Sequence, residues 1–214
     1  RENSGADMSL SFTTGNSYDV GDNKLGFLAS VSYKNETTYY DDYVDGQQFR
    51  KDVDGSIFEL NRDVTQQGER GENNVLISAL GGLSYKTDRS KYRFNVLHIQ
   101  NGESGAALTT QNNRIDRSNT IKKDILIYTE RSITNFFLSG KHTNEDASWT
   151  TEWKVSPTLS NVDDKDFRTT PFRVNDENGV FTIEASESGD ATRFFRELDE
   201  ITVANKLDLT RKHQ

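Results

Sequence analysis

The sequence predicts an all-β chain that forms one antiparallel sheet of about seven long strands. The first observation is period-two alternation, clearest where Trp149, Trp153 and Leu159 share one parity and Glu152 and Lys154 take the other. Such alternation places neighbouring side chains on opposite faces of a sheet. The second is that turn-forming residues separate the alternating runs, and the third is that short and long connections follow each other in strict succession.

The first hairpin is expected to join a strand over about 7–18 to a strand over 24–39. Its turn, 19–23, is rich in Asp, Gly and Asn, which tight turns between antiparallel strands prefer. Leu28 interrupts an otherwise regular pattern. Within each strand the apolar residues share one face: Met8, Leu10 and Phe12 in the first strand, and Leu25, Phe27, Ala29, Val31 and Tyr33 in the second.

A second hairpin is expected from strands over 73–86 and 91–100, joined by the short turn 87–90. In its second strand Arg93 and Asn95 have the parity opposite to the apolar residues. The apolar residues of this hairpin are Val75, Ile77, Ala79, Leu83, Tyr85, Tyr92, Phe94 and Val96.

The third hairpin joins 123–141 to 149–161 through the turn 142–148. Ile125 and Ile127 have odd parity whereas Phe136 and Leu138 have even parity. One extra residue in a strand reverses its pattern, so we expect a bulge within the fifth strand. Pro157 cannot donate to a ladder and is expected at a second bulge.

The last strand is expected over 201–212, where Val203 and Leu207 oppose Lys206 and Asp208. The segment just before it, ATRFFRELDE over 191–200, has the spacing of a short amphipathic helix with its phenylalanines on one side. Three long polar stretches, 40–72, 101–122 and 162–200, are expected as loops between hairpins. They are acidic on balance, and loops carry binding residues more often than their scaffolds do.

Composition excludes several classes of protein. The 214 residues carry a formal net charge of -8, which opposes binding to nucleic acid. The chain contains no cysteine, which excludes a disulfide, a thiol nucleophile and a zinc-thiolate site. No apolar run approaches the roughly 18 residues of a membrane helix. Hydrophobic residues make up 32% of the chain, which is little for a two-sided core but enough for strands that are apolar on one face.

Two architectures fit these strands: a soluble β-domain with the apolar face in its core, and a membrane barrel with the apolar face towards lipid. Short turns alternating with long loops, and strands longer than the usual 5–6 residues, favour an antiparallel transmembrane β-barrel segment with turns at one end and long loops at the other. Aromatic residues near the three turns are expected to form a belt at the membrane interface: Tyr18, Tyr85, Tyr92, Trp149 and Trp153.

The same alternation assigns the two faces of the predicted barrel. We expect Phe27, Val31, Trp149, Trp153 and Leu207 to meet lipid. We expect the lumen to be lined by Arg93, Asn95, Glu152, Lys154 and Lys206.

Motifs for catalysis or metal binding were sought and none aligned. His98, His142 and His213 have no second histidine or cysteine at ligand spacing. The acidic turns 41–46, 52–55 and 175–179 do not match the ligand positions of an EF-hand, although irregular calcium binding in a loop remains an alternative. The sequence therefore predicts no catalytic residue, metal ligand or cofactor, and it does not identify ligand-binding residues.

Several strand phrases resemble the barrel of bacterial TonB-dependent outer-membrane receptors: KLGFLASVSYKN, YTERSITNFFLSGKHT, WTTEWKVSPTLSNVDDKDFRTTPFR and RELDEITVANKLDLT. The likeness spans nearly the whole chain. It implies a 22-stranded barrel around a plug, located in the cell outer membrane, that takes up a scarce ligand with energy from TonB. The seven strands, at about thirty residues each, would be a third of such a barrel.

The resemblance implies partners as well: outer-membrane lipid, TonB acting through a plug that this chain does not contain, a small ligand and a surface lipoprotein. It implies a receptor and not an enzyme. The plug and the terminal aromatic residue of the last strand are missing, as in an internal barrel fragment. The alternative from another class is a soluble, secreted β-domain for adhesion or glycan binding.

Overall fold

The structure is a computed structural model that describes residues 6–50, 60–113, 120–174, 179–183, 185 and 189–212. They form one sheet with seven long strands and one strand of two residues, β7. The strands are β1 (Met8–Val20), β2 (Asn23–Arg50), β3 (Leu60–Lys86), β4 (Ser90–Asn113), β5 (Thr120–Thr143), β6 (Trp149–Val174), β7 (Phe181–Thr182) and β8 (Thr192–Arg211).

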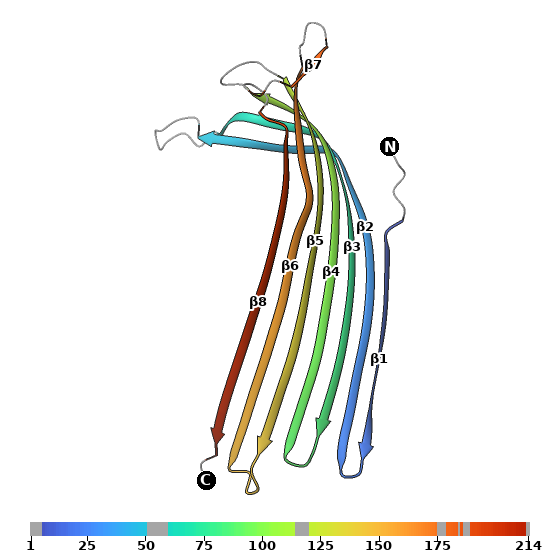
Figure 1. Cartoon of the computed structure of the whole chain (residues 1–214), viewed down its shortest axis with the longest axis vertical. Helices are drawn as coiled ribbons and strands as arrows, with labels where there is room; N and C mark the ends of the chain where they lie inside the picture. Colours follow the sequence, from blue (N-terminus) through green and yellow to red (C-terminus); the bar gives the residue numbers. More distant parts are fainter. Residues whose placement is uncertain are drawn as a thin grey trace.

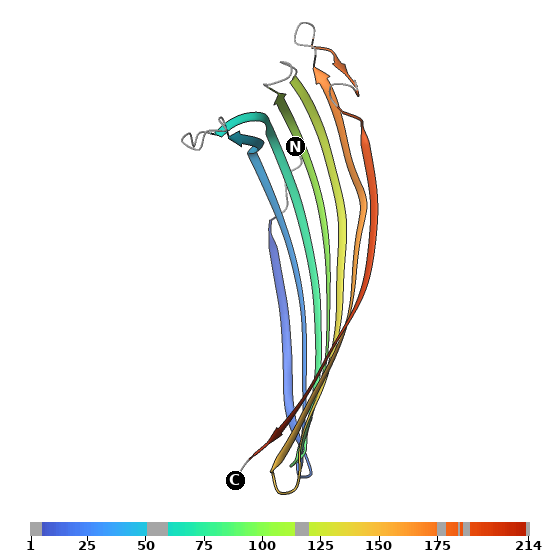
Figure 2. The same cartoon turned by 90° about the vertical axis from the view of Figure 1, so that its left-hand side faces the viewer.

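Every neighbouring pair of strands is antiparallel, in the order β1-β2-β3-β4-β5-β6-β8, and β7 pairs with the far end of β6. The strands form one curved layer, with the tight β1–β2, β3–β4 and β5–β6 turns together at one end (Figures 1 and 2). This confirms the predicted all-β chain and its single antiparallel sheet of long strands. The sheet is open, because β1 and β8 each have one long neighbour.

The strands reach far into the polar stretches that were expected as long loops. Strand β2 continues to Arg50 and β4 to Asn113, and β3 and β5 begin at Leu60 and Thr120. Polar residues occupy both faces of these extensions, so no apolar alternation marks them in the sequence. The predicted loop boundaries at 40–72, 101–122 and 162–200 are therefore wrong as boundaries of secondary structure, and residues 51–59, 114–119 and 175–178 lie outside the described residues.

The bulge predicted for the fifth strand is absent there. The β4–β5 register is constant over its whole length, so Ile125 and Ile127 lie on the face opposite to Phe136 and Leu138. The extra residue lies instead in β6, around Lys165, where the register shifts against both β5 and β8.

Pro157 lies inside the sheet without the expected bulge, since the register against β8 runs through it unshifted. The ladder between β5 and β6 is interrupted beside it, and the pairing resumes in the same register. The side-chain amide of Asn135 spans the interruption and donates to Ser156 Oγ at 2.9 Å and to Thr158 Oγ1 at 2.6 Å. These side-chain hydrogen bonds tie β5 to β6 at the place where the ladder lacks the backbone donor of proline.

The helix predicted over 191–200 is wrong, because residues from Thr192 onwards belong to β8. Its Phe194 pairs across the strands with Phe167 of β6, with ring centroids 6.1 Å apart. Pairing with a long neighbouring strand overrides the weak helical spacing of this segment.

Very little of this sheet is buried. Among the described residues the buried apolar side chains are Pro171, Ala107 and Ile121, of which the last two are 8% and 4% exposed. No helix in the described part of the chain is long and apolar enough to cross a membrane. A second layer that would bury the apolar residues against this sheet is absent from the described residues, as Figures 1 and 2 show.

Candidate functional site: two faces of one open sheet

One face of the sheet, here called the apolar face, carries apolar residues from all seven long strands, although Leu80, Leu97, Ile99 and Ile133 lie on the other face. The cross-strand register aligns four of the five predicted belt aromatics in a single row on this face. That row, the aromatic row, consists of Tyr18, Leu25, Tyr85, Tyr92, Gly140, Trp153 and Leu207. The fifth, Trp149, lies on the same face two rows nearer the turns, with the Arg211 guanidinium 5.4 Å from its ring.

Apolar side chains continue from the aromatic row as a band across the strands. The band runs from Tyr85 to Val75 on β3 and from Trp149 to Leu159 on β6, which is ten residue-to-residue steps in each case. At about 3.4 Å per residue this is roughly 34 Å along a strand, or about 25 Å for a strand tilted by about 45°. The band lies two rows nearer the turns on β6 than on β3. Such a shift is expected if the strands are tilted relative to the barrel axis, because the register rows then run obliquely to a band of constant height.

The apolar face is open to its surroundings. Phe12 and Leu207 are 65% and 66% exposed and Trp149 is 44% exposed. The predicted lipid-facing residues Phe27 and Val31 share this face and are exposed as well. A soluble monomer rarely exposes a contiguous apolar surface of this extent.

Within the aromatic row, Trp153 contacts two residues of β5, Gly140 and His142. Its indole lies across Gly140, the residue opposite it on β5, where a Cβ would overlap the ring. The indole Nε1–H donates to His142 Nε2 at 3.0 Å, so the other imidazole nitrogen, Nδ1, carries the proton that it shares with Ser90 Oγ at 3.0 Å. Tyr92 completes the cluster, with its ring edge-on to the imidazole at 5.2 Å.

The opposite face, here called the polar face, holds all five residues predicted to line a lumen: Arg93, Asn95, Glu152, Lys154 and Lys206. Hydroxyl pairs cross the strands on it, such as Ser32 with Ser78 at 2.7 Å. The buried side chains of the described residues also lie on this face: Ala107, Thr109, Ile121, Thr129, Ser139, Asp164 and Pro171. Side chains converge on the inner side of a curved sheet, so this burial identifies the polar face as the concave one.

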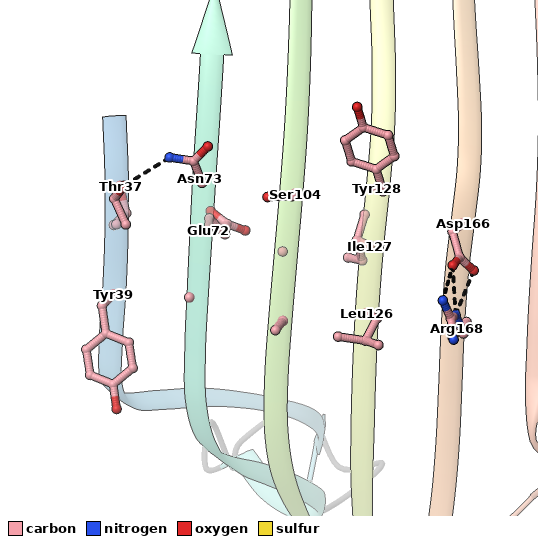
Figure 3. Close-up of a pocket in the computed structure, with 14 residues that line it drawn as sticks. Thr37, Tyr39, Glu72, Asn73, Ser104, Leu126, Ile127, Tyr128, Asp166 and Arg168 are labelled. Carbon is pink, nitrogen blue, oxygen red and sulfur yellow. Dashed lines mark hydrogen bonds and ion pairs between the residues drawn. The ribbon is translucent and has the colours of Figure 1, made fainter. Parts of the chain in front are cut away.

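A hollow of about 850 Å³ lies on the apolar face, just beyond the band and on the side away from the turns (Figure 3). Ten of its fourteen lining residues come from two consecutive register rows, and the others are Thr38, Glu72, Gly105 and Ile127 between them. One row is Thr37, Asn73, Ser104, Tyr128 and Asp166, and the next is Tyr39, Gly71, Ala106, Leu126 and Arg168.

The shape of the hollow follows from side-chain size. The two central strands contribute small residues, Gly71, Ser104 and Ala106, while the rings of Tyr39 and Tyr128 stand on either side (Figure 3). Aromatic walls with amide, hydroxyl and charged groups beside them can hold a small polar molecule. Because the hollow opens on the apolar face, it does not lie on a route along the polar face.

Charged groups gather at the β6 bulge beside this hollow. Asp166 accepts from Arg168 Nε at 2.9 Å and from Arg193 Nε at 2.8 Å, and these hydrogen bonds, Arg168 first, lower the pKa of Asp166 to about 2. On the polar face, Asp164 accepts from the Thr129 hydroxyl at 2.7 Å and from Arg196, and both hold the pKa of Asp164 below its ordinary value. The bulge thus sends carboxylates to both faces, where each finds an arginine.

The structure brings together no metal-binding group of three among the described residues. His98 is on the apolar face against Thr134, and the acidic run 41–46 belongs to β2. The other acidic runs, 52–55 and most of 175–179, and His213 lie outside the described residues. The hollow and the arginine-bound carboxylates were not predicted, because they depend on the register between strands far apart in the sequence.

Comparisons with known protein families, with curated proteins and with solved structures found no match.

Proposed function

We propose that this chain is part of a larger β-barrel in a bacterial outer membrane, which serves as a receptor and transporter for a small ligand. The observation that carries the proposal is the uncovered apolar band on one face of long antiparallel strands. Its height of about 25 Å matches the lipid-facing band of such barrels, and an aromatic row lies along its lower edge. In the proposed barrel Tyr18, Tyr85, Tyr92, Trp149 and Trp153 form the interface belt.

The open edges of the sheet support a barrel with more strands than these. Strands β1 and β8, of 13 and 20 residues, each leave one row of backbone donors and acceptors without a long partner strand. Long unpaired edges promote aggregation, and closure of the sheet removes them. We therefore propose that further strands complete the barrel, and the resemblance to TonB-dependent receptors suggests 22 in total.

The polar face then lines the lumen, and the turn end faces the periplasm. The ligand would be captured among the long-connection ends of the strands and pass along the polar face once a plug is displaced by TonB. A surface lipoprotein is a further proposed partner at the long-connection end. No catalytic step is proposed, and the described residues contain no group of three side chains that could hold a metal ion.

The competing function, a soluble secreted domain for adhesion or glycan binding, requires the apolar band to be covered by a second layer. Nothing in the described residues covers Trp149 or Leu207. The hollow between Tyr39 and Tyr128 could serve a glycan in either setting, so it does not separate the two functions.

The test is extraction of the intact protein followed by electrophoresis with and without boiling. We expect it to leave the membrane fraction only with detergent and to migrate faster when unboiled, as closed barrels do. Release into plain buffer as a monomer that melts cooperatively would reject the membrane proposal, and glycan binding would then be measured.

A further inference from the structure

Four lysines stand directly opposite one another at the turn end of the polar face. The register pairs Lys24 of β2 with Lys86 of β3, Lys86 with Lys91 of β4, and Lys91 with Lys141 of β5. We call these four residues the basic row. Neighbouring strands are about 4.8 Å apart, so the row is about 14 Å long.

These charges are poorly compensated by the chain itself. Lys24 reaches Asp19 at 3.5 Å, and Lys141 stands directly opposite Glu152 and attracts it, but Lys86 and Lys91 form no ion pair with any described residue. Arg93, one row further from the turns, also has no ionic partner in the described part of the chain. Like charges directly opposite each other destabilise a sheet. A chain with a net charge of -8 has thus concentrated unpaired cations on one small area.

The surroundings of the basic row limit what can bind there. Acidic residues stand at both of its ends: Asp19 on β1, and Glu152 and Asp208 on β6 and β8. They would repel an anion that extended past β5. Beside Arg93 the next row holds the small residues Gly26, Ser84 and Ser139, of which Ser139 is buried.

We propose that the basic row binds an acidic polypeptide segment that crosses the strands on the polar face. A single phosphate-sized anion would touch two adjacent lysines and leave the others repelling each other. A polypeptide carries carboxylates about 5–7 Å apart, at i and i+3 or i+4 of a helix or at i and i+2 of a strand, and so matches the whole row. The assignment of the polar face as the enclosed side rests on the proposed function, whereas the charge pattern does not.

The test uses the sign of a stability change. Replacement of Lys86 or Lys91 by glutamine removes repulsion from two flanking lysines, so it raises stability if the row is bare. If an acidic segment covers the row, the same replacement removes attraction and lowers stability. We expect both K86Q and K91Q to lower the temperature at which the intact protein loses its folded form, relative to the matched surface variant K212Q.

Salt separates the electrostatic cause from a packing defect. The Debye length falls from about 10 Å at 0.1 M to about 3 Å at 1 M, so the deficit of K86Q and K91Q should shrink at 1 M sodium chloride. An unchanged or raised transition temperature at low salt would overturn the proposal, and so would a deficit that salt does not reduce.

Cross-linking identifies the segment. A carbodiimide joins a lysine amine to a carboxylate in contact with it, so we expect amide links from Lys86, Lys91 or Lys141 to an Asp- or Glu-rich peptide outside these 214 residues. Links only to Glu152 or Asp208 of the same sheet would contradict the proposal. The transition temperature and the cross-links can be measured whether or not the protein needs detergent. Failure of the membrane proposal can therefore be distinguished from failure of the proposal for the basic row.

Discussion

A methyl group at Gly140 should destabilise the sheet through Trp153. The Cβ of an alanine there would lie far inside van der Waals contact with the indole atoms Cε2 and Nε1. The ring must therefore move, which costs about 1–3 kcal/mol as overpacking. Its hydrogen bond to His142, worth about 1 kcal/mol, would be lost as well. We expect G140A to reduce the free energy of unfolding by about 2–4 kcal/mol.

The matched control is G81A, on the same face two rows from Gly140, where a Cβ would meet nothing within 4 Å. This variant should change stability by less than about 0.5 kcal/mol. The free energies of unfolding of G140A and G81A are compared by unfolding the intact protein in urea, with mobility on an unboiled gel as the readout. In the G140A/W153A double variant the clash is gone, so the two single effects should not add. Equal stability of G140A and G81A would refute the packing of Trp153 over Gly140.

Two more predictions concern polar side chains. N135A should lower the free energy of unfolding by about 1–2 kcal/mol in the same urea assay, because the Asn135 amide bridges the ladder interruption. The control N161A removes one exposed hydrogen bond and should lower the free energy of unfolding by less. Equal losses in the two variants would contradict the bridging role of Asn135. Asp166 lies beyond the apolar band, and its pKa of about 2 is below the ordinary value of 3.8. The charged form of Asp166 therefore stabilises the fold fully above about pH 4, and this contribution disappears as pH falls through about 2. The stability difference between the natural protein and D166N, measured from pH 2 to 7, should be constant above about pH 4 and shrink towards pH 2; a difference independent of pH would contradict the pairing with Arg168 and Arg193.

Period two was enough to predict the part of each strand that crosses the apolar band. Phe27 and Leu83, for example, were assigned to one face from parity alone, and the register pairs them directly. The alignment of Tyr18, Tyr85 and Tyr92 followed from their equal distance to short turns, because a tight turn fixes the register of its hairpin.

The predictions that were wrong concern features that depend on the neighbouring strand. The strand extensions are polar on both faces, so the segment 40–50 carries no apolar alternation and was assigned to a loop. The reversal of parity between Ile127 and Phe136 reflects a change in which face is apolar beyond the band, and not a bulge in β5. The real bulge at Lys165 sits in a charged segment where parity has no meaning until the partners on β5 and β8 are known.

The central proposal is that the apolar face meets lipid, and one pair of neighbouring residues tests it most directly. Val203 and Thr202 are both exposed on β8 but point to opposite faces, and Val203 lies within the apolar band, one row from its end at Ile201. The measurement is the free energy of unfolding of V203R and T202R from lipid vesicles. If the apolar face meets lipid, V203R should cost more than about 1 kcal/mol, towards the roughly 2–4 kcal/mol of an arginine at the bilayer midplane, and T202R less than about 1 kcal/mol. Equal and small costs for both would show that both faces meet water, and would contradict the membrane barrel.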